Sequence, residues 1–183
     1  MGSKHSNVQS LVYNELYKNG YPHGGLGFPL TWAGVFPKEL NCLDIGCGHG
    51  ILCKRFKKYV GVDISDYVIE ENKKKYPGIE FYAKDAKDIK DERIFDVVLA
   101  IDTLEHFPEK EIEWYLEAIS KITTEYYLFS ICCRKSGYKA SDGGELHTCL
   151  LNQGQWLELL ANYFIIRRCS EMNRQQTFCV KAV

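Results

Sequence analysis

A glycine-rich turn is the part of this sequence whose residue types and spacing point most directly to chemistry. Residues 43–50 read LDIGCGHG, an aspartate followed by three glycines: Asp44, Gly46, Gly48 and Gly50. Glycines in such a turn let a ligand approach the backbone, and a helix that begins after the turn offers unpaired N–H groups. A dinucleotide-binding turn has the spacing G-x-G-x-x-G, and Ile51 stands where that pattern requires its third glycine. A dinucleotide is therefore a poor match to this turn.

Acidic residues also occur at the ends of three later predicted strands. Asp63 ends the strand at 59–63, Asp85 follows the strand at 79–82, and Asp102 follows the apolar run FDVVLAI at 95–101. In doubly wound sheets, ligands bind in a crevice outside the carboxyl ends of the strands. We therefore expect these acids to lie near the glycine-rich turn.

The four motifs together resemble those of the class I S-adenosylmethionine-dependent methyltransferases. In that family, an acid at the position of Asp63 accepts hydrogen bonds from both ribose hydroxyls. Lys84-Asp85-Ala86 is similar to the family's adenine-contacting acid with its small neighbour, and residues 100–106, AIDTLEH, are similar to the end of the fourth strand in many small-molecule members. The resemblance covers about residues 40–183.

The resemblance implies that the cofactor is S-adenosyl-L-methionine and that the protein is a methyltransferase without a metal. The residues it assigns to cofactor binding are Asp44, Gly46, Cys47, Gly48, Gly50, Asp63, Ile64, Asp85, Ala86, Ile101, Asp102 and Leu104. Each assignment has a structural alternative. The glycines alone form a tight turn, Asp63 competes with Ser65 for the cap of the next helix, Asp85 lies in a charged stretch, and Asp102 ends a strand.

His106 is the candidate catalytic residue, because an imidazole titrates near neutral pH and can accept a proton from an attacking oxygen or nitrogen. The alternative is that His106 packs at the start of the helix that begins near Pro108. His147 follows the polar, glycine-containing loop at 134–146, close in chain order to where the family's substrate residues gather, and is a second possible catalytic histidine. The favoured interpretation is a surface histidine. We also expect the loop at 133–149 to close over the site.

Apolar runs alternate with helical patterns along the chain, which is typical of an α/β fold. We predict a doubly wound, mostly parallel seven-stranded sheet with helices on both faces. The last two strands form an antiparallel pair, because residues 169–176 are too few for a crossover helix. The predicted strands are 40–45, 59–63, 79–82, 95–101, 126–132, 163–168 and 177–183, and the predicted helices include 51–58, 65–76 and one that begins at Pro108.

Two segments differ in composition. Residues 1–39 hold an amphipathic helix around Val8–Tyr17 and a loop rich in Gly, Pro and aromatic residues, whereas residues 40–183 hold the predicted cofactor-binding domain. Tyr21 and Trp32 are candidates for a lid over the acceptor, and the alternative is that the segment is scaffold.

Composition limits the partners and the compartment. With 23 basic and 24 acidic residues, the net charge is −1, which argues against strong nonspecific binding to phosphates. No run approaches the ~20 apolar residues that a membrane span needs, and no signal peptide precedes the domain. The eight cysteines form no C-x-x-C pair, so we expect a reduced cytoplasmic protein without zinc or disulfides.

Three functions remain open from the sequence. A small-molecule or nucleotide acceptor comes first, because the motif of DNA amino-methyltransferases and the Pro-Cys nucleophile of cytosine-carbon methyltransferases are both missing. A nucleic-acid methyltransferase is the second, with Lys54, Arg55, Lys57 and Lys58 as a basic surface. The third is a non-catalytic module that binds the cofactor.

Overall fold

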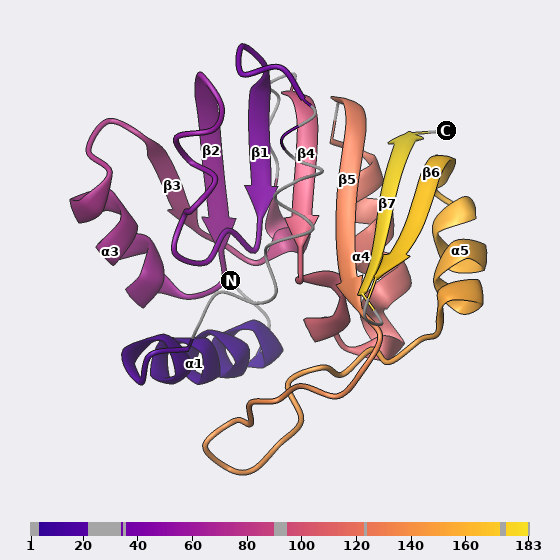
Figure 1. Cartoon of the computed structure of the whole chain (residues 1–183). Helices are drawn as coiled ribbons and strands as arrows, with labels where there is room; N and C mark the ends of the chain where they lie inside the picture. The colour runs from indigo at the N-terminus through magenta and orange to yellow at the C-terminus, as the bar shows by residue number, and fades with distance from the viewer. Residues whose placement is uncertain are drawn as a thin grey trace.

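The computed structural model describes residues 4–21, 34, 36–89, 95–122, 124–172 and 175–182. A single sheet with the strand order β3-β2-β1-β4-β5-β7-β6 runs through the molecule (Figure 1). Its strands are β1 (Asn41–Ile45), β2 (Lys58–Asp63), β3 (Glu80–Ala83), β4 (Phe95–Ile101), β5 (Thr124–Cys132), β6 (Phe164–Met172) and β7 (Gln175–Ala182). The expected α/β fold with a mostly parallel sheet is confirmed.

Strand order explains where a ligand can bind. Strands β1 to β5 pair in parallel, and β7 pairs antiparallel with both β5 and β6. The chain runs outward from β1 through β2 to β3, and outward from β4 to β5 on the other side, so the direction of winding reverses between β1 and β4. Such a switch point leaves a crevice at the carboxyl ends of the strands. In Figure 1, α1 (Lys4–Lys18) and the loop that follows β5 lie at this edge.

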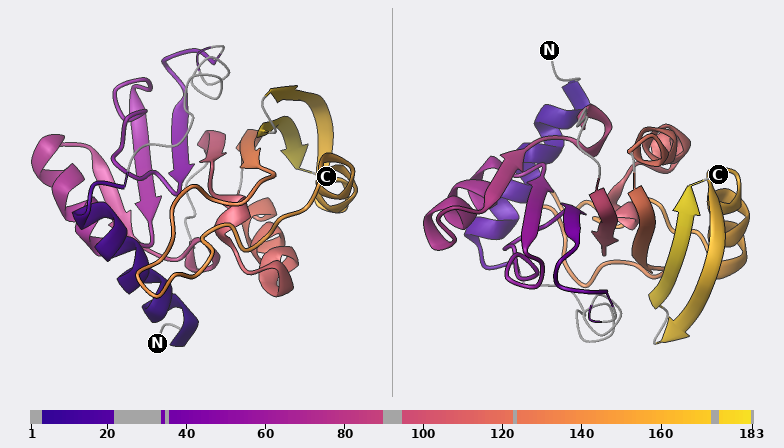
Figure 2. Two further views of the ribbon diagram at one scale, coloured as in Figure 1. Left: turned by 60° about the horizontal axis from the view of Figure 1, so that its bottom comes forward. Right: turned by 90° about the horizontal axis from the view of Figure 1, so that it is seen from above.

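Burial on both faces makes the central strands apolar. Every residue of β4 (FDVVLAI) is buried except Asp96, which is partly exposed. Successive residues belong to different core clusters: Val97 belongs to the first cluster and Val98 to the second. Since neighbouring side chains of a strand point to opposite faces, the two clusters are the two faces of the sheet. Helix α3 (Asp66–Lys75) covers the first cluster, and α4 (Ile112–Ser120) and α5 (Gln153–Ala161) cover the second (Figure 2).

The helix predicted at 51–58 is wrong. The chain forms a series of turns there, with hydrogen bonds from the Cys53 N–H to the Gly50 carbonyl and from the Arg55 N–H to the Leu52 carbonyl. Only residues 51–57 separate the turn from β2, and a segment of this length gains few helical hydrogen bonds against the cost of starting a helix. The turns instead bury Leu52, Cys53 and Phe56 against the sheet.

The remaining helices agree with the expected ones. Helix α1 covers the predicted helical pattern, and α3 begins after Ser65, whose hydroxyl accepts the Val68 N–H as its N-cap. Trp32 lies outside the described residues. In the part of the chain that the structure describes, every helix is too short or too polar to cross a membrane.

Candidate active site

A cavity of about 490 Å³ opens at the carboxyl ends of the central strands. Its walls come from the glycine-rich turn, the ends of β2 and β4, helix α1 and the loop that follows β5. The predicted site residues that line it are Asp44, Gly46, Cys47, Gly48, Asp63, Ile64, Asp85, Ala86, Ile101, Asp102 and His106. Gly50 and Leu104 do not line the cavity.

Close packing explains the first glycine of the turn. Gly46 has a φ of +72°, and a Cβ atom there would lie 2.3 Å from Oγ1 of Thr103. The Thr103 hydroxyl donates to the carbonyls of Ile45 and Ile101, which joins the ends of β1 and β4. The backbone N–H groups of Gly46 and Cys47 both donate to the carbonyl of Val62. The turn is thus fixed to both neighbouring strands, and these two N–H groups are not available to a phosphate.

Gly50 has a packing role rather than a position at the cavity. A Cβ atom at Gly50 would lie 2.9 Å from the Phe81 ring. Leu104, in the short turn η2 (Leu104–His106), is fully buried in a core cluster. Both residues support the wall from behind.

Asp44 is a buried acid at the floor of the cavity. Its carboxylate is 3% exposed and accepts a 2.6 Å hydrogen bond from the Tyr59 hydroxyl. Burial raises the pKa of Asp44 to about 7, although the Tyr59 hydrogen bond opposes this shift. Burial likewise raises the pKa of the Cys47 thiol, so Cys47 is a small apolar wall residue and not a nucleophile.

Asp63, at the end of β2, is held by the backbone on both sides. Its Oδ2 accepts the Gly48 N–H at 3.0 Å, and its Oδ1 accepts the Ser65 N–H at 2.9 Å. Burial raises the pKa of this carboxyl, and the two N–H donors counteract the shift. The Ser65 hydroxyl caps α3, so Asp63 does not act as the side-chain cap of that helix. The carboxylate instead faces the cavity beside the glycine-rich turn.

Asp85 is paired with a lysine. The Lys87 ammonium lies 2.8 Å from its Oδ2, both side chains being nearly fully buried, and the Tyr115 hydroxyl donates to the same oxygen at 3.2 Å. Asp85 also accepts the Lys87 N–H and so caps the short turn η1 (Ala86–Asp88). The charged stretch seen in the sequence is therefore not solvated at this point: the acid is neutralised inside the wall, next to Ala86.

Asp102 lies at the end of β4 in an unusual backbone conformation. Its φ is +50°, a left-handed value that costs a non-glycine residue about 1–2 kcal/mol. Its backbone N–H donates to the Ser130 carbonyl, and the Ser130 hydroxyl donates to its Oδ1 at 3.2 Å. These contacts hold the carboxylate at the cavity between β4 and β5.

His106 contacts the N-terminal helix. Its Nδ1 lies 2.7 Å from the Tyr13 hydroxyl and 3.1 Å from the Leu146 carbonyl oxygen. Because a carbonyl can only accept, the Leu146 contact is a hydrogen bond in the tautomer with the proton on Nδ1, and in that tautomer Nε2 carries the lone pair. Burial, together with the neighbouring His147, lowers the pKa of His106 to about 3. His106 is thus a neutral imidazole at physiological pH.

Sequence reasoning missed several residues of the cavity wall. Tyr13, Tyr17 and Tyr21 follow one another at a spacing of four residues, and the Tyr17 hydroxyl lies 3.5 Å from Oδ2 of Asp63. That spacing places the rings of Tyr13 and Tyr17 on one side of α1, a signal that the sequence contains. Tyr21 lies beyond the end of α1 and was already a lid candidate from the sequence. Glu105 and Cys132 also line the cavity, and no sequence pattern connects them. His147, predicted to lie on the surface, is buried; the prediction was wrong because the loop at 134–146 folds back over the cavity.

Comparison with known proteins agrees with this architecture. Residues 42–125 match a family model described as a methyltransferase domain. The matched part runs from β1 to the start of β5 and so contains the glycine-rich turn, Asp63, Asp85 and Asp102. The magnesium protoporphyrin IX methyltransferase of Synechocystis PCC 6803, solved with bound S-adenosylmethionine, has the same fold: the TM-score is 0.69 at 17% identity, with 99% of each chain covered.

Two further relatives come from other organisms. The 1,6-didemethyltoxoflavin-N1-methyltransferase of Burkholderia thailandensis superposes with a TM-score of 0.74 at 15% identity, over all of this chain and 92% of the other. The ubiquinone biosynthesis O-methyltransferase of Pelagibacter ubique is 32% identical over 93 residues, which is 46% of this chain and 38% of that protein. The chain thus covers less than half the length of this curated relative.

Proposed function

We propose that the protein binds S-adenosylmethionine in this cavity and transfers its methyl group to a small-molecule acceptor. The observation that carries the proposal is the position of Asp63. Its buried carboxylate faces the cavity, fixed by N–H groups of Gly48 and Ser65. A carboxylate held in this way is a strong acceptor for two vicinal hydroxyls, such as those of a ribose.

The rest of the cofactor fits the same wall. Ile64 and Ala86 offer apolar surface for the adenine, with the neutralised pair of Asp85 and Lys87 behind it. Asp44 and Asp102 lie on the side of the glycine-rich turn and β4, where the amino group of the methionine moiety would meet an acid. Bound cations of this kind lower the pKa of a neighbouring carboxyl, so Asp44 would bind the ligand in its ionised form.

The acceptor side is aromatic. Tyr13, Tyr21 and Tyr138 line the cavity, and Tyr21 packs edge-on against Tyr138 of the loop after β5 with ring centroids 5.3 Å apart. The faces and edges of these rings offer apolar surface suited to an aromatic acceptor. Several curated relatives are O-methyltransferases by name, which favours a hydroxyl as the acceptor group. A nucleotide also fits a cavity of this kind.

The chemistry needs little from the protein, because the sulfonium methyl is already activated. An acceptor oxygen attacks the methyl carbon, the C–S bond breaks, and its electron pair stays on sulfur to give S-adenosylhomocysteine. The proton of the hydroxyl passes to Nε2 of His106, the ring nitrogen that the Leu146 contact leaves unprotonated. Positioning of the acceptor and exclusion of water supply most of the remaining rate acceleration.

Helix α1 fits the role of a cover in this scheme. The Asn14 side chain accepts from the Ser65 hydroxyl at 2.6 Å, and Tyr13 and Tyr17 reach His106 and Asp63. We therefore assign residues 1–39 to closing the acceptor site and residues 40–183 to binding the cofactor. A cytoplasmic location stays a prediction from the sequence.

Calorimetry on Asp63→Ala tests the proposal. Two lost charge-assisted hydrogen bonds, at roughly 1.5–3 kcal/mol each, should weaken S-adenosylhomocysteine binding by at least about 100-fold. Asp66→Ala is the matched control, because Asp66 is an exposed acid three residues away and should leave affinity unchanged. Equal affinities in wild type and Asp63→Ala, or tight binding of NAD in place of the methyl donor, would contradict the proposal.

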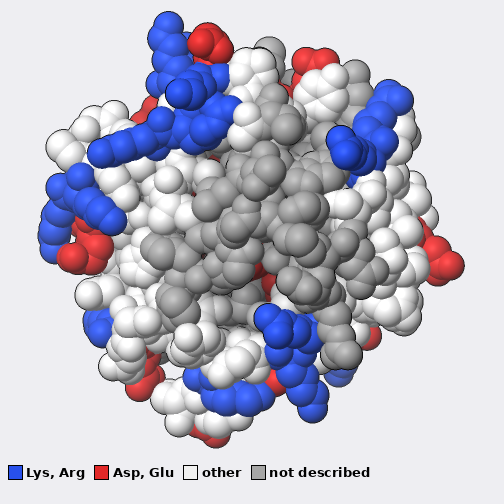
Figure 3. Space-filling model, in the orientation of Figure 1, with Lys and Arg blue, Asp and Glu red and all other residues white. Residues whose placement is uncertain are grey.

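Nucleic acid remains the second acceptor class. On the face shown in Figure 3, the Lys and Arg residues that the structure describes lie in several separate groups. A protein that follows a phosphate backbone usually presents a continuous basic stripe. The described residues visible on this face form no such stripe, so our proposal puts the small acceptor first.

A further inference from the structure

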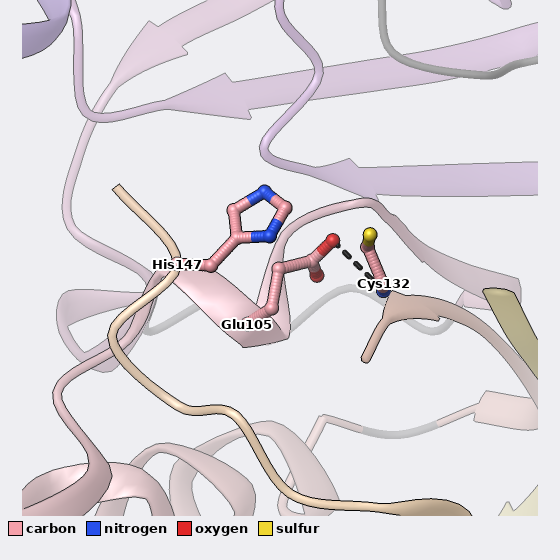
Figure 4. Close-up of side chains that lie close together, drawn as sticks. All are labelled: Glu105, Cys132 and His147. Atoms are coloured by element: carbon pink, nitrogen blue, oxygen red, sulfur yellow. Dashed lines mark hydrogen bonds between the residues drawn. The ribbon is translucent and has the colours of Figure 1, made fainter. Parts of the chain in front are cut away.

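A second group of reactive side chains lies in the acceptor wall of the cavity. Glu105 belongs to the turn after β4, Cys132 ends β5, and His147 follows the loop after β5. One possible ligand atom from each residue lies within 4.8 Å of the other two. Figure 4 shows the Glu105 carboxylate between the His147 ring and Cys132.

Only one of the two oxygens of the Glu105 carboxylate has a hydrogen-bond partner. The residue is fully buried, and its Oε1 accepts the Cys132 N–H at 3.0 Å. Its Oε2 is buried without a hydrogen-bond partner, and in the part of the chain that the structure describes no Lys or Arg forms an ion pair with it. A buried carboxylate is costly unless a cation or several donors compensate it. Burial raises the pKa of Glu105 well above its ordinary value, so the carboxyl is neutral when nothing compensates its charge, and a cation beside Oε2 would stabilise the ionised form.

We infer that Glu105, Cys132 and His147 bind a divalent transition-metal ion, with zinc the best match. One carboxylate oxygen, one thiolate and one imidazole are the ligand types that zinc prefers, and three protein ligands leave a fourth position open, as in catalytic zinc sites. Magnesium and calcium favour oxygen ligands and suit this set poorly.

The geometry needs only small movements. Zinc–ligand distances of about 2.0–2.3 Å place the ligand atoms of a tetrahedral site about 3.3–3.8 Å apart. The ligand atoms must therefore approach one another by about 1 Å to bind the ion. The Arg134 carbonyl lies 2.5 Å from Nδ1 of His147, so binding of the ion through Nε2 would keep this contact, whereas binding through Nδ1 would replace it.

The open position would face the acceptor. All three residues line the cavity, and the His147 ring packs edge-on against His106 with centroids 4.7 Å apart. This role rests on the proposed function: an acceptor hydroxyl bound to the ion would lose its proton more readily, as metal-bound water does. The oxygen lone pair would then attack the methyl carbon as the C–S bond breaks, with the hydroxyl proton passing to Nε2 of His106.

Titration of the dialysed full chain with Zn²⁺ and with Co²⁺ tests the site. We expect one ion per chain, and a thiolate-to-cobalt absorption band that is absent in Cys132→Ser. Cys132→Ser and His147→Gln should each weaken Zn²⁺ binding by at least about 100-fold. Cys133→Ser and His49→Gln are matched controls, because they remove a neighbouring thiol and another cavity imidazole and should leave Zn²⁺ affinity unchanged.

Two outcomes overturn the inference. One is the absence of stoichiometric Zn²⁺ binding to a wild-type chain that melts cooperatively. The other is binding that Cys132→Ser and His147→Gln leave within about threefold of wild type. The Zn²⁺ affinity of Glu105→Gln is interpreted together with its melting curve, because Glu105 also stabilises the end of β5 through its hydrogen bond with the Cys132 N–H. Calorimetry with S-adenosylhomocysteine on the same samples tests the proposed function separately. Failure of the zinc site can therefore be distinguished from failure of the cofactor site.

Discussion

The two walls of the cavity are built in different ways. The cofactor wall consists of the glycine-rich turn and the end of β2, in which the backbone N–H groups of Gly48 and Ser65 hold the two oxygens of Asp63. The acceptor wall consists of side chains from α1, the turn after β4 and the loop after β5, such as Tyr13 against His106. Few of its contacts are between backbone groups.

This difference separates what the fold determines from what the side chains determine. A wall made of strand ends and of tightly packed glycines is rigid and binds one ligand in one pose. Such a wall suits a cofactor shared by many enzymes. A wall made by tyrosines, histidines and a long loop can change its ligand by changing side chains. The predictions below test that contrast.

Gly46→Ala should give the largest effect, because it fills the space that Thr103 occupies. The added Cβ would lie 2.3 Å from Thr103 Oγ1, at a φ of +72°. Strain and overpacking together should lower the free energy of unfolding by about 2–5 kcal/mol. Gly78→Ala is the control: it has a φ of +87° with no atom within 4 Å, and should cost only about 1–2 kcal/mol. Equal losses in chemical denaturation would show that the cofactor wall is not sterically fixed.

Asp44→Asn should change the pH dependence of stability. The folded pKa of about 7 lies above the ordinary 3.8, so between these values the folded chain holds a proton that the unfolded chain has lost. The associated stability is complete below about pH 4 and is lost as the pH rises through 7. Wild type should therefore lose about 2–4 kcal/mol more than Asp44→Asn between pH 4 and 8.5. Urea denaturation at several pH values measures this, and parallel curves for the two proteins would mean that Asp44 is ionised when folded.

His106→Gln should reduce acceptor turnover by about 10–100-fold and leave S-adenosylhomocysteine affinity unchanged. The residue belongs to the acceptor wall, and its contacts are with Tyr13, Leu146 and His147 rather than with the cofactor turn. Because its pKa is about 3, titration of His106 should cause no change in rate between pH 5 and 8. Steady-state kinetics measures turnover, and calorimetry measures cofactor affinity. A loss of cofactor affinity together with turnover would contradict the assignment of His106 to the acceptor wall alone.

The same contrast explains what the sequence could predict. The strand FDVVLAI, the N-cap at Ser65 and the meeting of Asp44, Asp63 and Asp102 at one edge follow from local patterns and parallel pairing. The segment 51–58 was mispredicted because its apolar spacing fits a helix, while the short connection to β2 permits only turns. The residues of the cofactor wall can be predicted from local sequence patterns because they lie directly after strands.

The acceptor wall depends on contacts between distant parts of the chain. Glu105 meets Cys132 across 27 residues, and Tyr13 meets His106 across 93. Nothing local in the sequence signals such pairs. The pKa of His106 was also unpredictable, since it depends on burial by α1 and by the loop that carries Leu146.

Transfer of a labelled methyl group tests the central claim most directly. The full chain is incubated with methyl-labelled S-adenosylmethionine and separate pools of hydroxylated aromatic metabolites, nucleotides and RNA, with Asp63→Ala as the inactive control. We predict label in a small-molecule product together with an equal amount of S-adenosylhomocysteine, both lost in Asp63→Ala. Label in RNA alone would contradict the small acceptor, and methyl transfer that persists in Asp63→Ala would contradict the assigned cofactor site.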